Sequence, residues 1–213
     1  MLIDLINKIT IFVGKRNSGK SILMKYMIEQ NRKNYSKMYL ISPSESVNHF
    51  FESVIKKECV FNEYSEKWMT SLISKMTEIN QGKTAKDPSF KNVLIILDDL
   101  GSDVNFHSSK ALSIIVARGR HLGISIFIAL QHLNSCPPLL RSNCDYVFCG
   151  KLSRNSIELL IENYHTGDLD RKQFIAMYNQ STIDYSFLVI YNNATISNHL
   201  NLIYSAIKVP NIN

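Results

Sequence analysis

The segment Gly14-Lys15-Arg16-Asn17-Ser18-Gly19-Lys20-Ser21 has the spacing of a phosphate-binding loop, GxxxxGK[ST], with every fixed position filled. Glycines at its two ends permit backbone conformations that other residues resist, so the loop can turn its N–H groups inward around phosphate oxygens. Lys20 would neutralise the β- and γ-phosphates of a nucleoside triphosphate, and Ser21 would ligate Mg²⁺. The segment therefore predicts binding of Mg²⁺ and ATP, although nothing in it distinguishes ATP from GTP.

Two carboxylates follow a run of five aliphatic residues, 93–97. The carboxyl end of a buried parallel strand is where an acid that holds Mg²⁺ belongs. We assign Asp98 to the metal, directly or through water, and Asp99 to the orientation of the attacking water. Glutamate would be more familiar at position 99, and the shorter aspartate leaves the catalytic base open. Either carboxylate could instead only cap the next segment.

Gln131 is the polar residue that follows another apolar run, 124–130. Its amide would lie beside the γ-phosphate and detect it through a hydrogen bond; a merely polar strand terminus is the alternative. Three arginines flank this strand in the sequence: Arg118, Arg120 and Arg141. An arginine that reaches the nucleotide of a neighbouring subunit could raise the rate by about 10³–10⁵-fold. For each one, a solvated or ion-paired side chain is the alternative.

These residues require strands that alternate with helices. The hydrophobic patterns predict strands at 8–13, 37–41, 59–61, 93–97, 124–130 and 145–149, with 185–191 as the last strand. They predict helices at 21–30, 65–79, 104–117 and 171–178, one that opens at Asn155, and one that Ser42 caps, with Pro43 at its first position and Glu45 completing a capping box. This alternation favours an α/β fold, a mostly parallel central sheet flanked by helices on both faces, in a single domain over residues 1–213.

The composition of the chain indicates its kind of partner and compartment and disfavours a membrane span. A net charge of +6 favours polyanionic partners such as nucleic acid or an anionic membrane surface. The four cysteines form no CxxC pair, which disfavours zinc and indicates reduced thiols in an intracellular compartment. No apolar run approaches the ~20 residues of a membrane helix, and we interpret residues 1–13 as a first strand rather than a signal peptide.

The order of these motifs resembles the FtsK–HerA superfamily of P-loop ATPases, with a RecA/FtsK-like fold. The similarity rests on Ala117-Arg118-Gly119-Arg120-His121-Leu122-Gly123-Ile124, which runs on to Leu130-Gln131. Within the superfamily the chain looks most like the poxvirus-type genome-packaging ATPases of large DNA viruses. That second resemblance rests on the compact chain, on Asp98-Asp99 in place of Asp-Glu, on Leu140-Arg141-Ser142-Asn143, and on Tyr185-Ser186-Phe187-Leu188-Val189-Ile190 near the end.

The resemblance implies a ring of identical subunits that hydrolyses ATP and drives double-stranded DNA, independently of its sequence, into a capsid. It implies the host cytoplasm at virus assembly sites, with the virion as a further location and capsid proteins as further candidate partners. The lysine-bearing loop 81–91 is one candidate DNA surface, and a merely solvated loop is the alternative. Two other functions stay open: a nucleoside or nucleotide kinase, and a switch protein that uses the nucleotide as a signal.

Overall fold

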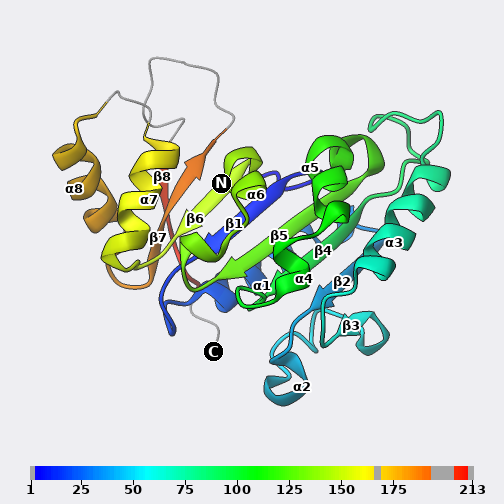
Figure 1. Cartoon of the computed structure of the whole chain (residues 1–213), viewed down its shortest axis with the longest axis horizontal. Helices are drawn as coiled ribbons and strands as arrows, with labels where there is room; N and C mark the ends of the chain where they lie inside the picture. Colours follow the sequence, from blue (N-terminus) through cyan, green and yellow to red (C-terminus); the bar gives the residue numbers. More distant parts are fainter. Residues whose placement is uncertain (1–2, 166–168, 193–203, 211–213) are drawn as a thin grey trace.

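The structure, a computed structural model, describes residues 3–165, 169–192 and 204–210. Eight strands form one sheet in the order β3-β2-β4-β5-β1-β6-β7-β8 (Figure 1). The strands are β1 (Ile9–Val13), β2 (Lys37–Ile41), β3 (Val60–Phe61), β4 (Val93–Asp98), β5 (Ile124–Leu130), β6 (Tyr146–Cys149), β7 (Ser186–Tyr191) and β8 (Tyr204–Lys208). The first six strands in this sheet order pair in parallel with their neighbours. Strand β7 pairs antiparallel with β6, and β8 pairs antiparallel with β7. The predicted α/β fold with a mostly parallel sheet is confirmed.

Helices connect the strands and cover the sheet. They are α1 (Lys20–Asn31), α2 (Glu45–Asn48), α3 (Glu66–Ile79), α4 (Val104–His107), α5 (Lys110–Leu122), α6 (Pro138–Asn143), α7 (Arg154–Tyr164) and α8 (Arg171–Ser181). Figure 1 shows α1 on one face of the sheet and α3, α5 and α6 on the other. Every residue of β1 and β5 is buried, as expected for strands that helices cover on both sides.

The centre of the sheet is filled by aromatic and aliphatic side chains. The Phe12 ring lies 4.8 Å from the Phe148 ring and 5.5 Å from the Phe127 ring, between centroids. Parallel pairing places Val13 beside both Leu130 and Cys149, so β1, β5 and β6 end at the same edge. The segments that follow these strands therefore meet at one edge of the sheet.

Three predictions about the elements are wrong. Strand β8 follows β7, so 185–191 is not the last strand. The expected helix 104–117 is two helices, because Asp103 accepts a hydrogen bond from Phe106 N and Ser109 accepts one from Leu112 N, which gives each helix its own N-terminal cap. The helix expected to open at Asn155 begins one residue earlier, at Arg154, after the capping side chain of Ser153.

The predicted cap at Ser42 is also wrong. Helix α2 begins at Glu45, and its N-cap residue Ser44 makes no side-chain cap. Ser42 is buried and donates its hydroxyl to Asp98 Oδ2 at 3.2 Å. The Glu45 carboxylate accepts from Phe51 N at 2.6 Å, so it holds the next loop instead of completing a capping box.

Candidate nucleotide-binding site

The loop that links β1 to α1 is anchored to the end of β5 and to the segment that follows β6. Gly14 N donates to Leu130 O at 3.2 Å, and Lys15 N donates to Lys151 O at 2.7 Å. Gly19 has φ of 87°, a left-handed conformation that favours glycine, and it leads directly into α1. The sheet thus fixes the loop against the amino terminus of a twelve-residue helix, which is a favourable place for anions.

The interior of this loop fits phosphate oxygens. A Cβ atom on Gly14 would lie 2.7 Å from Ser18 Oγ, so a side chain there would fill the cradle. The Ser18 hydroxyl is buried and has no hydrogen-bond partner within the described part of the chain. Buried polar groups are normally satisfied, so this hydroxyl is available to a ligand oxygen.

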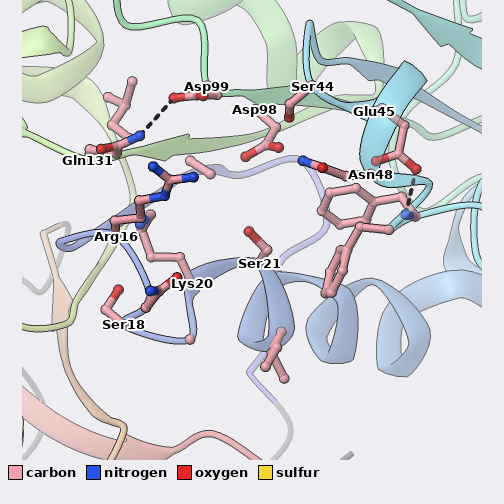
Figure 2. Close-up of a pocket in the computed structure, with 17 residues that line it drawn as sticks. Arg16, Ser18, Lys20, Ser21, Ser44, Glu45, Asn48, Asp98, Asp99 and Gln131 are labelled. Atoms are coloured by element: carbon pink, nitrogen blue, oxygen red, sulfur yellow. Dashed lines mark hydrogen bonds between the residues drawn. The ribbon is translucent and has the colours of Figure 1, made fainter.

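Lys20 lies across the mouth of the loop (Figure 2). Its Nζ donates to Gly14 O at 2.7 Å and to Lys15 O at 3.0 Å. Burial lowers the pKa of this ammonium, and the negative charges of Asp98 and Asp99 oppose that effect. A bound triphosphate would supply the negative charge that this half-buried lysine lacks.

Asp98 lies at the end of β4 and faces the same cavity (Figure 2). Burial, followed by the charge of Asp99, raises the pKa of this carboxyl to about 6, although the Ser42 hydroxyl and Lys20 act in the opposite direction. Ionisation of this carboxyl is costly without a partner, but the ionised form is favourable beside a divalent cation. This arrangement fits a ligand of Mg²⁺.

Asp99 and Gln131 lie next to each other at adjacent strand ends. Asp99, the residue after β4, has φ of 58°, which is uncommon for a residue other than glycine. Gln131 Nε2 donates to Asp99 Oδ1 at 3.3 Å, as Figure 2 shows. The structure therefore brings together the loop, both carboxylates and the glutamine that the sequence indicated.

These groups surround a cavity of about 550 Å³. Part of its wall was missed from the sequence, namely the segment after β2 that contributes Ser44, Glu45, Asn48, Phe50 and Phe51. None of these residues belongs to a nucleotide-binding motif, and the signal for their place at the site is that β2 neighbours β4 in a parallel sheet. Lys25 on α1 fixes the part of this segment that contains Phe50. Its Nζ donates to Phe50 O at 3.1 Å and lies 5.0 Å from the Phe50 ring centroid.

The three arginines are not part of this cavity. Arg120 forms an ion pair with Asp145, a buried carboxylate that also accepts from Ile9 N at 2.8 Å. Ile9 begins β1, so this pair lies at the edge of the sheet opposite the phosphate-binding loop. Arg141 donates to Cys136 O at 3.2 Å, and Arg118 is exposed on α5. Within one subunit, the structure separates the arginines from the site.

Few protein groups are available to a metal ion. Within the described ranges, no group of three or more His, Cys, Asp and Glu side chains could hold one. Ser21 and Asp98 line the cavity and would hold Mg²⁺, with phosphate and water oxygens completing the octahedral set that this ion prefers. No helix in the part of the chain that the structure describes is long and apolar enough to cross a bilayer.

Comparison with solved structures supports the P-loop NTPase fold. B204, the DNA-packaging ATPase of Sulfolobus turreted icosahedral virus, superposes with a TM-score of 0.68 and 14% identity, over 98% of this chain and all of that one. The genome packaging NTPase B204 of Sulfolobus turreted icosahedral virus 2, in complex with ATP-gammaS, gives a TM-score of 0.65 and 15% identity, over 95% and 98% of the two chains.

Comparison by sequence identifies the family. Protein 075L of Invertebrate iridescent virus 6 is 27% identical over 180 residues, which are 84% of this chain and 68% of that protein. The family described as poxvirus A32 protein matches residues 5–207, nearly the whole chain. The resemblance found in the motifs is therefore confirmed, and the chain belongs to the poxvirus A32 protein family.

Proposed function

We propose that this chain is an ATP-hydrolysing motor that moves double-stranded DNA into a viral capsid, with residues 1–213 forming one ATPase domain. Its family supports the proposal, as do its structural neighbours, which include packaging ATPases and one complex with ATP-gammaS. The observation that carries it is the convergence of the phosphate-binding loop, Asp98, Asp99 and Gln131 around one cavity. A viral origin agrees with the related iridescent virus protein.

The residues of this cavity have separate roles in hydrolysis. The backbone N–H groups of residues 16, 17 and 19–21 and the Lys20 ammonium bind the phosphates, and Ser18 Oγ gains the partner that it lacks. Ser21 and Asp98 would hold Mg²⁺, which would supply positive charge against the β- and γ-phosphates. Asp99 orients the attacking water and accepts its proton, and Gln131, bonded to Asp99, responds to the γ-phosphate.

The arginine comes from a second subunit. Arg120 is engaged by Asp145, and Arg141 is engaged by a backbone carbonyl. Arg118 is exposed, and among the described residues no hydrogen bond or ion pair engages its guanidinium. Arg118 is therefore the first candidate to reach a neighbour's γ-phosphate, with Arg120 and Arg141 as the others. A ring of identical subunits provides this contact at every site.

A mixing experiment tests the shared site. Arg118→Ala and Lys20→Ala are each expected to abolish hydrolysis alone. When the two proteins are mixed, some interfaces pair an intact loop with an intact arginine, and activity should return. Arg120→Ala and Arg141→Ala, tested in the same way, show whether one of the other two candidates supplies the arginine instead. Activity that never returns in any mixture would contradict an arginine supplied between subunits.

The motor is tested by phosphate release with and without duplex DNA, and with a panel of nucleosides as acceptors. We expect release that duplex DNA stimulates independently of its sequence, and that Lys20→Ala and Asp98→Ala eliminate. Transfer of the γ-phosphate to a nucleoside would establish a kinase instead. Binding of ATP without any turnover would favour the switch protein. Fractionation of infected cells would test the proposed location at virus assembly sites, in the virion and beside capsid proteins.

A further inference from the structure

A strained turn beside the phosphate-binding loop carries an exposed aromatic side chain. Residues 183–186 form a tight turn that Ser186 N closes by donating to Ile183 O at 3.0 Å. Its two central residues, Asp184 and Tyr185, have φ of 51° and 59°. Turns with positive φ at both central positions strongly prefer Asn-Gly or Asp-Gly, and a bulky residue there is an outlier.

Tyr185 therefore occupies a position where glycine would be less strained, and its side chain is 65% exposed. Burial in the core cannot be the reason that the ring is present. Strained backbone of this kind concentrates at ligand-binding sites, where the surrounding structure compensates for its cost.

The ring lies against the phosphate-binding loop. Tyr185 Cδ1 is 3.6 Å from the point that a Cβ atom on Gly19 would occupy, and Val209 Cγ2 is 3.1 Å from the same point. Val209 N donates to Tyr185 O at 3.0 Å, which ties the segment after β8 to the turn. An aromatic ring and an aliphatic side chain thus flank the last glycine of the loop.

A second cavity, of about 320 Å³, opens beside the ring. Arg16, Asn17 and Ser18 line both this cavity and the larger one that holds the carboxylates. The remaining wall comes from Lys15, Lys151, Thr182, Asp184, Tyr185 and Ser186. A ligand whose phosphates lie in the loop can therefore extend into this cavity, which is within the usual size range of small-molecule sites.

We propose that Tyr185 forms the base-binding part of the nucleotide site, with the nucleobase stacked on its ring, and that the buried Val209 supports the turn from behind. This inference rests on the proposed function, because it places the base of the nucleotide that the motor hydrolyses. Stacking suits any base, since every base has a π face. The Asp184 carboxylate is the acceptor in the cavity for ribose hydroxyls or an exocyclic amine.

The test compares ATP with inorganic tripolyphosphate, which has the phosphates but no base. Calorimetry with Mg²⁺ should show that wild-type protein binds ATP more tightly than tripolyphosphate. Tyr185→Gly suits the positive φ and removes the ring, so the variant should fold at least as stably as wild type. We expect it to lose ATP affinity on the order of tenfold, while its affinity for tripolyphosphate stays unchanged.

Matched variants separate this proposal from the proposed function. Tyr185→Phe keeps the stacking surface and should bind ATP as wild type does, whereas Lys20→Ala should lose both ligands. If Tyr185→Gly binds ATP as tightly as wild type does, the base-binding role is overturned and the ATPase function is not affected. This holds whether or not the variant also self-associates less well. Failure of wild-type protein to bind either ligand would overturn the ATPase itself and this proposal with it.

Discussion

Replacement of Asp98 by asparagine should stabilise the nucleotide-free protein while it destroys the metal site. Burial and the charge of Asp99 raise the pKa of Asp98 from 3.8 to about 6, so the folded protein binds this proton more tightly than the unfolded chain does. Stability therefore falls as pH rises from about 4 to about 6. At ~1.36 kcal/mol per pH unit, the ionised carboxylate costs about 3 kcal/mol at pH 8, and asparagine should recover that amount.

The assay is urea denaturation of wild type and Asp98→Asn, with no nucleotide, at pH 5 and pH 8. About half of the gain in unfolding free energy should be present at pH 5 and all of it at pH 8. Glu162→Gln, which removes an exposed carboxylate from α7, is the control and should show no such dependence. A variant less stable than wild type at pH 8 would refute the reasoning, because attraction to Lys20 would then outweigh the cost of burial.

Three further predictions concern the fold, the acidic edge and DNA. Gly123→Ala should lower the unfolding free energy by more than ~2 kcal/mol in urea denaturation. The reason is that Gly123 has φ of 71° and that a Cβ atom there would lie 2.3 Å from Lys91 O. A variant as stable as wild type would contradict this prediction. Ser42→Ala removes a hydrogen bond that lowers the pKa of Asp98, so the pKa should rise in this variant. The acid limb of the pH–rate profile of ATP hydrolysis should then move to higher pH. An acid limb at the wild-type pH would count against this contact. DNA affinity, measured in a salt titration, should fall linearly on a log–log plot with equal slopes for unrelated sequences, and slopes that differ between sequences would argue against phosphate contacts.

The sequence predicted the phosphate-binding loop, the acidic strand end and the glutamine strand end because each depends on local pattern. A buried parallel strand is a run of aliphatic residues, and the polar residue after the run must lie at the sheet edge. Asp98, Asp99 and Gln131 each follow such a run, and parallel pairing of β4 with β5 makes their meeting a consequence of the fold. No contact between distant segments had to be known in advance.

The parts that were missed depend on tertiary contacts. Strand β8 is five residues long and pairs with β7 at the end of the sheet, and its sequence, YSAIK, gives a weak strand pattern. Ser42 resembled a helix cap because Pro43 and Glu45 follow it, but the nearby Asp98 carboxylate accepts its hydroxyl instead. The strained turn at Tyr185 carries no glycine to indicate positive φ, so its conformation could not be inferred from residue type.

The arginines show how chain order can mislead about distance. Arg120 and Gln131 are eleven positions apart in the sequence, but the seven residues of β5 separate them, and a strand rises ~3.3 Å per residue. They therefore lie near opposite ends of a strand about 20 Å long, which is too far for an arginine side chain to span. An arginine beyond the start of β5 can act on a γ-phosphate only if the starting edge of one sheet faces the ending edge of another. Such a contact joins two different surfaces, and repetition of it closes a ring or propagates a filament. The position of the phosphate-binding loop relative to α5 thus makes head-to-tail assembly a condition of the arginine's catalytic role.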